Sequence, residues 1–205
     1  MLCKVENVEI SGFKAAMRGM RNPKESWSRN DTVENENINI GENDLDLALR
    51  LTHAGPEHRK FLRMIHVSFD VTLPRFVWSE FDTYHNNTKN STSTMHKLLA
   101  ANKPITLEMF DYDEITKDAI QLAVDKIEGL RKLYIKKDCP NKNEILLTAK
   151  RILPESFLQM RTVDTNYEEL RTIYHQRKNH RLPHWHEFCA WIETLPYAKE
   201  FLIEK

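Results

Sequence analysis

The stretch 81–96, FDTYHNNTKNSTSTMH, gathers side chains that could bind a polar ligand. Within residues 85–96 there are amides, hydroxyls and the basic side chains His85, Lys89 and His96, but no Gly or Pro. Hydroxyl, amide and backbone N–H groups at a turn can together donate hydrogen bonds to a phosphate. An exposed polar loop that caps a helix near Lys97 is the alternative. Composition alone leaves both interpretations open.

A second group of chemically useful side chains lies on one predicted helix. A helix starting near residue 165 places four residues on one face, namely Asn166, Leu170, Tyr174 and Arg177. If this face lines a pocket, Arg177 offers a fork of donors to a phosphate or a carbonyl. Alternatively, Arg177 complements the C-terminus of the helix and Asn166 serves its first turn. Spacing does not decide between these two roles.

Metal and thiol chemistry receive less support from the sequence. The tract HRLPHWHE could ligate a metal through His184 and His186, but a surface histidine cluster beside Pro183 is more common, so we predict no metal site. Cys189 lies near His186 in the sequence. A nucleophile and its base are recognised by geometry, so no thiol nucleophile and no other catalytic residue is assigned.

Charge and composition exclude several functional classes. The 205 residues carry 30 Lys and Arg against 30 Asp and Glu, so no overall positive field attracts nucleic acid or an anionic membrane. The five glycines build neither a GxGxxG fingerprint nor a P-loop. Three distant cysteines, no signal-peptide pattern and no apolar run of membrane length favour a cytoplasmic protein.

Hydrophobic periodicity predicts the elements that position these residues. Alternation indicates strands over 2–12 and 63–73. Helical spacing and cap residues indicate helices at 13–20, from Asn43 to Gly55, from Pro74 into the polar stretch, at 111–137 with Asp111 and Glu114 as a capping box, at 143–152, from Thr165 with Glu168 three residues later, and at 184–204 with a weak point at Pro196.

The segment 21–42 differs from these elements because it is polar, rich in Asn and without period. We therefore expect a mobile surface loop there. A minority of strand among a majority of helix predicts an α/β (α+β) fold, and the length predicts one domain over 1–205.

The residues from Phe69 to His96 resemble the core of the flavin-dependent thymidylate synthases, the ThyX family. The family signature R-H-R-x-x-S-x-N-E-x-S-x-R-Y falls without gaps on 83–96, and FDVTLPRFV (69–77) matches the strand, proline and helix before it. Asn90 and Ser93 are kept, and Thr88 replaces the first Ser. Several charged positions differ: Arg-His-Arg is Thr83-Tyr84-His85, Glu is Ser91, the later Arg is Met95 and the closing Tyr is His96.

A second block supports the resemblance. RILPESF (151–157) and the stripe from Asn166 to Arg177 look like the basic residue before Leu-Pro in the family and the helix whose Asn contacts flavin and whose Arg contacts the uracil nucleotide. The basic residue is either Lys150 or Arg151. Where the family has an Arg two residues after the Asn, this chain has Glu168. Upstream, His58 matches a family histidine near the flavin.

The resemblance implies a ThyX-like domain with a central antiparallel-type sheet flanked by helices, assembled as a homotetramer with active sites at subunit interfaces. FAD would relay reducing equivalents from NADPH while a one-carbon unit moves from methylenetetrahydrofolate to C5 of dUMP, giving dTMP. It assigns to the nucleotide Glu80, Asn90, Ser91, Ser93, Lys150, Arg151 and Arg177. It assigns to the flavin His58, Thr83, Tyr84, His85 and Asn166.

The missing arginines set the open question. Each lost charge-assisted contact to a phosphate costs about 1.5–3 kcal/mol, and Met95 or His85 cannot replace a fixed bidentate cation. Either Lys89, His96 and Arg177 compensate, or the ligand or the reaction has changed. A non-catalytic nucleotide-binding or assembly protein on the same scaffold is therefore the rival hypothesis, and an unrelated α+β interaction protein is a third.

Overall fold

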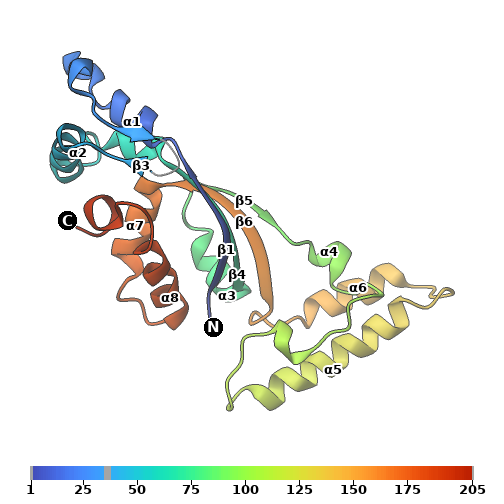
Figure 1. The fold of residues 1–205 in the computed structure, drawn as a ribbon. Helices are drawn as coiled ribbons and strands as arrows, with labels where there is room; N and C mark the ends of the chain where they lie inside the picture. Colours follow the sequence, from blue (N-terminus) through green and yellow to red (C-terminus); the bar gives the residue numbers. More distant parts are fainter. Residues whose placement is uncertain (1, 35–37, 205) are drawn as a thin grey trace. The chain divides into compact units, whose positions relative to one another are not determined.

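A four-stranded sheet forms the centre of the fold. The computed structural model describes residues 2–34 and 38–204. The strands run in the order β1-β4-β6-β5, with β1 at Lys4–Ser11, β4 at His66–Pro74, β6 at Leu158–Asn166 and β5 at Thr88–Ser91. They form an antiparallel sheet flanked by helices, which confirms the predicted α/β (α+β) class (Figure 1).

The remaining elements are helices and one short hairpin. The α-helices are α1 Phe13–Gly19, α2 Glu42–Ala54, α3 Arg75–Phe81, α4 Thr94–Lys97, α5 Lys117–Tyr134, α6 Lys142–Arg151, α7 Tyr167–Arg177 and α8 Pro183–Ile192. Single turns are η1 Asn22–Lys24, η2 Trp27–Arg29, η3 Lys60–Met64, η4 Leu107–Met109 and the π-helical η5 Lys199–Ile203. The hairpin pairs β2 Val33–Glu34 with β3 Ile38–Asn39.

Strand β4 follows its sequence pattern closely. Val67, Phe69, Val71 and Leu73 are each no more than 1% exposed, and the residues between them are partly exposed. The Phe69 ring packs against two aromatic rings of α8, with its centroid 4.5 Å from that of Trp191 and 5.9 Å from that of Phe188. Figure 1 shows α7 and α8 on one side of these strands. The predicted strand over 63–73 is therefore confirmed in type, and β4 starts three residues later.

Strand β6 was not expected from the sequence, and its inward-facing residues explain why. Its buried positions include Gln159, Val163 and Thr165, so two of these three buried residues are polar. Alternation in burial is present, but alternation in hydrophobicity is hidden. Strand β5 was missed for a different reason, because all four of its residues are polar and none is buried.

Two predicted helix starts are wrong by a few residues. The expected capping box of Asp111 and Glu114 does not form, because Asp113 and Thr116 close a turn of their own: Asp113 Oδ1 accepts from Thr116 N at 2.8 Å and from Thr116 Oγ1 at 2.7 Å. Helix α5 then begins at Lys117. Helix α7 begins after Asn166 rather than at Thr165, because Thr165 still belongs to β6.

The expected helix over 184–204 is two elements. Helix α8 ends at Ile192, and η5 begins only at Lys199. Between them lies Pro196, which lacks an N–H to continue a helix, followed by Tyr197 at φ +53. The predicted weak point is thus a complete break.

The segment 21–42 contains regular structure that the sequence did not reveal. Besides η1, η2 and the hairpin, it is tied to the start of α2 by Asp44, which is fully buried and accepts hydrogen bonds from Asn30, Asp31 and Thr32. In return Asp31 accepts from Asp44 N at 3.0 Å. The expected mobility of the loop stays a prediction, and its residues 35–37 lie outside the described residues.

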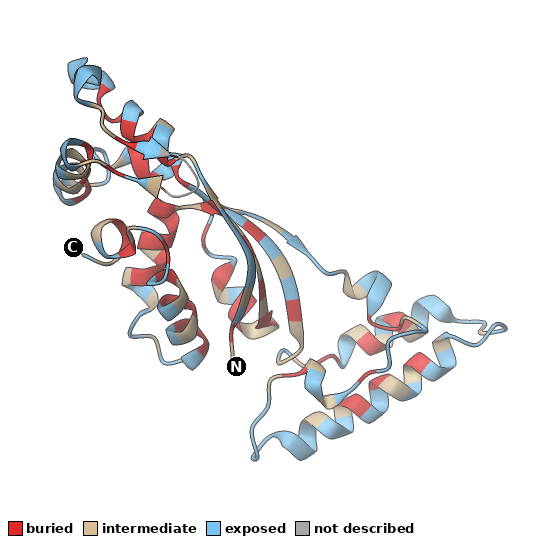
Figure 2. Cartoon of the chain, in the orientation of Figure 1, coloured by how far each residue is buried: buried red, intermediate tan, exposed pale blue. Residues whose placement is uncertain are grey.

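The described residues divide into two compact units. The first comprises described residues of 2–71, 84–89 and 162–204, and the second comprises 72–83 and 90–161. The expectation of a single domain stays a prediction. Buried residues line the facing sides of the elements in Figure 2, and among the described residues no helix is long and apolar enough to cross a bilayer.

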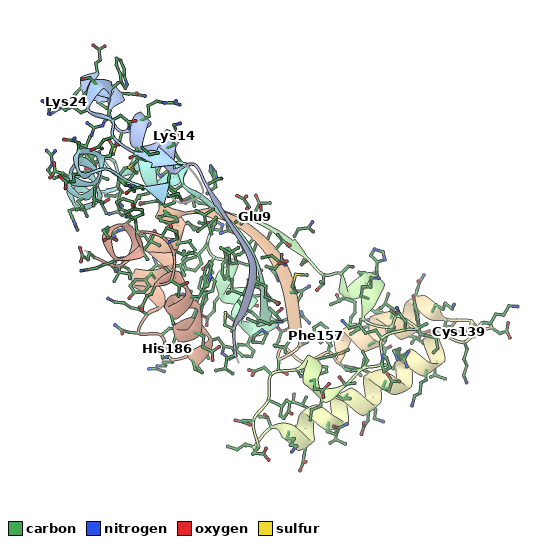
Figure 3. All side chains as sticks on the ribbon, viewed as in Figure 1. Glu9, Lys14, Lys24, Cys139, Phe157 and His186 are labelled. Atoms are coloured by element: carbon green, nitrogen blue, oxygen red, sulfur yellow. The ribbon has the colours of Figure 1, made fainter. Side chains whose placement is uncertain are left out.

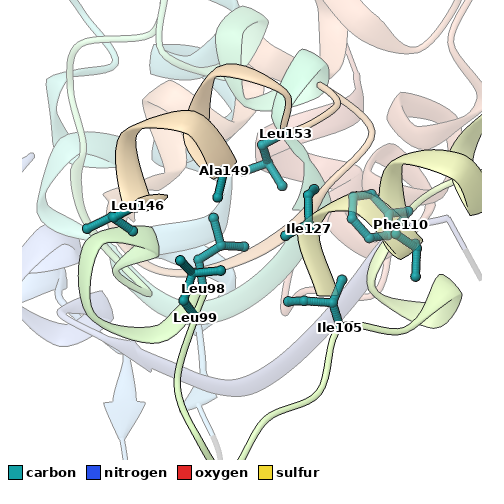
Figure 4. Packing of buried hydrophobic residues seen from close by; sticks show 9 residues of the cluster. Leu98, Leu99, Ile105, Phe110, Ile127, Leu146, Ala149 and Leu153 are labelled. Carbon is teal, nitrogen blue, oxygen red and sulfur yellow. The ribbon is translucent and has the colours of Figure 1, made fainter. Parts of the chain in front are cut away.

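The second unit has its own hydrophobic core between α5, α6 and the segment after α4. It consists of Leu98, Leu99, Ile105, Phe110, Val124, Ile127, Leu146, Ala149 and Leu153 (Figure 4). Ile127 and Ala149 are fully buried. Burial of this apolar surface stabilises the unit at roughly 25 cal/mol per Å², and it fixes the two chain segments on either side of the cluster.

Candidate functional site

In the first unit, Arg177 at the end of α7 is held by Tyr84. Arg177 Nε donates to the Tyr84 hydroxyl at 2.8 Å, and that hydroxyl donates to Gln176 Oε1 at 2.9 Å. The Arg177 guanidinium also lies 4.8 Å from the ring centroid of Trp185. Burial raises the pKa of Tyr84, while the hydrogen bond from Arg177 opposes the rise. Tyr84 is therefore a neutral phenol at neutral pH.

Asn166 performs a local task at the other end of α7. Its side chain accepts from Glu169 N at 3.0 Å, so it is the N-cap of the helix. This was one of the two roles that the sequence left open. The stripe that the spacing predicted is present, since Leu170 and Tyr174 on it are buried, but its two polar ends are both engaged with other residues of the chain.

The loop before β5 is attached to α7 by Glu169. This carboxylate is 4% exposed and accepts from Asn86 N, Asn86 Nδ2 and Asn87 Nδ2, each at 3.1 Å. The loop includes exposed His85, one of the predicted flavin contacts. Asn87 Oδ1 is buried and has no hydrogen-bond donor among residues 2–34 and 38–204. The loop is thus rigidly placed and keeps one unused acceptor.

Glu168, at the position where the family has an Arg, is compensated inside the unit. Arg59 Nε lies 3.0 Å and 2.9 Å from the two Glu168 carboxylate oxygens, and both side chains are largely buried. The preceding residue, His58, is exposed, and its Nε2 lies 3.4 Å from Glu57 Oε1. His58 therefore stays accessible next to a fixed ion pair.

In the second unit, Thr83 and Glu80 lie at the end of α3. The Thr83 hydroxyl donates to the Glu80 carbonyl at 2.7 Å, which closes the last turn of the helix. Glu80 is partly exposed and Thr83 is exposed. Of the three residues that replace Arg-His-Arg, Thr83 closes a helix, Tyr84 binds Arg177, and His85 faces solvent.

The residues after this helix form β5 and the turn into α4. Asn90 and Ser91 are exposed on β5, while the Ser93 hydroxyl accepts from His96 N at 3.3 Å as the cap of α4. Thr92 is hydrogen-bonded to β6, because its backbone N–H donates to the Met160 carbonyl at 3.0 Å. The polar stretch is thus an ordered strand and turn.

A pocket of about 430 Å³ opens beside this turn, within the second unit. One part of its lining is polar and includes the hydroxyls of Thr92, Ser93 and Thr94 with the cations Lys97 and Lys103. Another part is apolar and includes Leu98, Ile105, Met109, Phe157 and Leu158. The arrangement suits a small molecule that has one flat apolar part and one anionic part.

A further cation reaches the same turn from α6. Lys150 Nζ lies 3.2 Å from Met95 Sδ, whereas Arg151 is exposed. Met95 occupies the position where the family signature has its later Arg. The structure therefore places Lys150, of the two candidates, beside the turn.

Arg131 and Glu128 of α5 hold the segment 100–105, which contributes Lys103 and Ile105 to the pocket lining. Arg131 donates to both Glu128 carboxylate oxygens at 2.7 Å and to the carbonyls of Ala100 and Ala101. Glu128 Oε2 also accepts from Ile105 N at 2.9 Å. The hydrogen bond from Arg131 lowers the pKa of Glu128 to about 2. Lys103 therefore lies on a segment that this ion pair anchors.

Neither thiol chemistry nor a metal centre emerges from the geometry. Burial, with Glu193 nearby, raises the pKa of Cys189 to about 12, so this thiol stays protonated at neutral pH. No group of three or more His, Cys, Asp or Glu side chains within 2–34 and 38–204 is arranged to hold a metal ion.

Sequence reasoning missed Glu169, Lys97 and Lys103. A signal for Glu169 existed, because Asn166-x-x-Glu169 has the spacing of an N-cap and its third helical residue. The predicted helix start at Thr165 was one residue too early, so Glu168 was taken as the third residue after the cap instead of Glu169. Lys103 carried no signal, since tertiary contacts bring its segment to the pocket: the hydrogen bonds of Arg131 and Glu128 and the burial of Ile105.

Comparison with solved structures decides the fold. The flavin-dependent thymidylate synthase ThyX from Helicobacter pylori, complexed with FAD and dUMP, has a TM-score of 0.74 at 18% identity over 100% of this chain and 98% of that chain. This chain has a ThyX-like fold. The UMP/dUMP methylase PolB from Streptomyces cacaoi, bound with 5-Br dUMP, has a TM-score of 0.64 at 16% identity over 97% and 93%.

A second structure of Helicobacter pylori ThyX, also with FAD and dUMP, has a TM-score of 0.73 at 17% identity over 98% of this chain. No protein-family model matches the sequence, and no curated protein does. The ThyX-like fold is thus shared over the full length, while the side chains have diverged.

Proposed function

We propose that this chain is a flavin-dependent enzyme that transfers a one-carbon unit to C5 of a pyrimidine nucleotide, with dUMP as the first candidate. The observation that carries the proposal is the pocket beside the β5–α4 turn, in which Ser93, Lys97 and Lys103 meet an apolar wall. The ThyX-like fold supports it, because similar structures hold FAD and dUMP or 5-Br dUMP.

The pocket residues suit a nucleoside monophosphate. The volume of the pocket, about 430 Å³, lies in the usual range for small-molecule sites. A pyrimidine ring would pack on Leu98, Phe157 and neighbouring apolar side chains. Lys97, Lys103 and Lys150 would supply the positive charge for the phosphate that the family signature takes from arginines. Asn90, Ser91 and Glu80 would complete the polar contacts.

The resemblance also assigns Arg177, which lies in the first unit, to the nucleotide. Because Tyr84 and Trp185 restrict its guanidinium, less side-chain entropy is lost when it binds a carbonyl or phosphate oxygen. Tyr84 acts on the ligand through Arg177, and it is a positioning residue in this proposal.

One buried acceptor of the first unit, the side-chain oxygen of Asn87, would suit a flavin. Asn87 Oδ1 is a buried acceptor without a donor among the described residues, and the imide N–H of a flavin would satisfy it. His58, His85 and the Asn166 amide of the first unit would make other contacts. The resemblance also assigns Thr83, a residue of the second unit, to the flavin. FAD, when bound, would carry reducing equivalents from NADPH, with methylenetetrahydrofolate as the one-carbon donor. The assembly would be a homotetramer.

A second function is favoured by a specific observation. The Arg-His-Arg of the family is absent, and Tyr84 in its place occupies Arg177. A nucleotide-binding protein without turnover would keep the pocket of the second unit and lose the flavin. It would be stabilised against heat by dUMP, since a ligand that binds only the folded state raises the melting temperature, and it would release no tritium from C5-labelled dUMP.

The test of the flavin is the visible spectrum of the purified protein after incubation with FAD and removal of free FAD. The proposal predicts retained flavin absorbance that changes when dUMP is added. Absence of flavin absorbance under these conditions would refute the flavin-dependent function.

The test of the nucleotide pocket uses matched lysine variants. Lys97→Glu is expected to abolish the thermal stabilisation by dUMP, because it reverses charge at the polar rim of the pocket. Lys126→Glu, an exposed lysine on α5 that does not line the pocket, is the control and keeps the stabilisation. Equal loss in both variants would show that overall charge, not the pocket, governs binding.

A further inference from the structure

The first unit contains a larger pocket, of about 690 Å³, that the proposed nucleotide site does not use. Its wall comes from α1, the turns η1 and η2, helix α2 and η3, so every lining residue lies between Gly19 and Met64. The pocket therefore forms within one unit, between part of the segment that the sequence predicts to be a loop (21–42) and the residues from α2 to η3.

A buried arginine marks one side of this pocket. Arg21 is 3% exposed, and its Nε donates to Asp44 Oδ1 at 2.5 Å. Its Nη2 is buried and has no hydrogen-bond acceptor within the described ranges 2–34 and 38–204. A buried guanidinium N–H without an acceptor is costly. An acceptor on a bound molecule would remove that cost.

The charge of the wall is positive. Asp44 balances Arg21, and Asp46 Oδ2 on the rim lies 2.7 Å from Arg50. The rest of the lining carries three further positive charges, on Lys24, Arg29 and Lys60, and one further negative charge, on Glu57. The lining of this pocket therefore has an excess of positive charge, although the whole chain has a formal charge of zero.

Part of the pocket lining is apolar, and this part is called the floor below. Met20, Leu47, Leu51, Phe61 and Met64 all line it. An apolar floor together with cationic side chains suits a molecule with a flat or apolar body and a group of several negative charges. Inorganic ions alone would leave this apolar surface uncovered.

We propose that this pocket binds an organic diphosphate, with the pyrophosphate among Arg21, Lys24 and Lys60 and the organic body on the floor around Leu51 and Phe61. Two sources share this chemistry: the pyrophosphate of FAD and a separate nucleoside diphosphate. His58, assigned to the flavin, also lines the pocket, so the FAD arm rests on the proposed function, whereas the pyrophosphate site does not.

The experiment measures binding of inorganic pyrophosphate, ADP and FAD to the full-length protein by titration calorimetry. The test variant is the double change Lys24→Glu with Lys60→Glu, which leaves buried Arg21 and its ion pair in place. The control is Lys14→Glu, an exposed lysine of α1 that does not line the pocket. Figure 3 labels both Lys14 and Lys24 in this part of the chain.

The wild type is expected to bind pyrophosphate and to bind ADP more tightly, and the double variant should lose at least about tenfold in both affinities. The Lys14→Glu variant should bind as the wild type does. If FAD affinity falls with ADP affinity, the occupant is the flavin cofactor. If FAD affinity is unchanged while ADP affinity falls, it is a nucleoside diphosphate.

Two results would overturn the proposal. One is that wild-type protein binds neither pyrophosphate nor ADP. The other is that the control loses as much affinity as the double variant. Neither result involves dUMP or the β5–α4 pocket, so a failure here is distinct from a failure of the proposed enzymatic function.

Discussion

The Tyr84 hydroxyl lies 2.8 Å from Arg177 Nε and links a residue of the altered signature to the end of α7. The same hydroxyl donates to Gln176 Oε1. A neutral phenol can accept one hydrogen bond and donate another, as the Tyr84 hydroxyl does here. Tyr84, which stands where the resembling signature has its His, therefore orients the charged side chain of Arg177.

Tyr84→Phe tests this relationship. The variant removes the acceptor of the Arg177 Nε–H and the donor to Gln176, so the free energy of unfolding should fall by about 1–3 kcal/mol. If Arg177 contacts the nucleotide, dUMP affinity should fall as well. Tyr112→Phe, a change at an exposed tyrosine, should alter neither quantity. Unchanged dUMP affinity in Tyr84→Phe would argue against a positioning role for Tyr84.

Lys150 and Arg151 should differ in their effect on nucleotide binding. Lys150 Nζ lies at the Met95 sulfur beside the pocket, while Arg151 is exposed. Lys150→Ala should weaken dUMP binding by about tenfold or more, as expected for loss of a charge-assisted contact. Arg151→Ala is its matched control and should bind normally. The reverse ranking, measured by titration calorimetry, would contradict the structural assignment.

The Glu128–Arg131 ion pair should make stability depend on acid pH. The pKa of Glu128 is about 2 in the folded state, below its ordinary value of 4.5, mainly because Arg131 donates to it. Its stabilisation is therefore present above about pH 4.5 and is lost as pH falls towards 2, by up to about 3 kcal/mol.

Urea unfolding of wild type and Glu128→Gln over this pH range measures the effect. The variant should be less stable at neutral pH and should lose less stability on acidification. Glu114→Gln, at a highly exposed carboxylate, should follow the wild type. If wild type and Glu128→Gln lose stability in parallel, the ion pair does not carry the pH dependence.

Asn166 offers a way to separate a structural role from a ligand-binding role. Asn166→Ala removes the N-cap of α7 and should cost about 1 kcal/mol of unfolding free energy. Asn166→Asp keeps a capping oxygen but lacks the amide donor. It should retain the melting temperature and bind FAD more weakly. Wild-type FAD affinity in Asn166→Asp would show that the amide serves the helix alone.

The sequence predicted well those elements whose buried face is apolar. Strand β4 could be predicted because its buried residues Val67, Phe69 and Val71 recur at every second position. The central part of α5 could be predicted because buried Ile127 belongs to a set of apolar residues at helical spacing. The resemblance to the ThyX family predicted the fold for a different reason, since it rested on the order of two motif blocks and not on periodicity.

The remaining features depend on contacts that local patterns do not encode. Strand β6 buries Gln159 and Thr165, and the ordered part of 21–42 depends on buried Asp44 across the chain. The candidate site shows the same limit. Ser93 could be found from the signature. Lys103 reaches the pocket because Arg131 and the packing of Ile105 hold its segment, and these tertiary contacts have no sequence pattern.

Tritium release from C5-labelled dUMP tests the central claim most directly. Purified protein supplied with FAD, NADPH and methylenetetrahydrofolate is predicted to release tritium above a protein-free background, and Lys97→Glu should abolish the release while Lys126→Glu should not. A protein that is stabilised by dUMP and retains FAD, yet releases no tritium, would contradict the proposed C5 chemistry and leave a nucleotide-binding role.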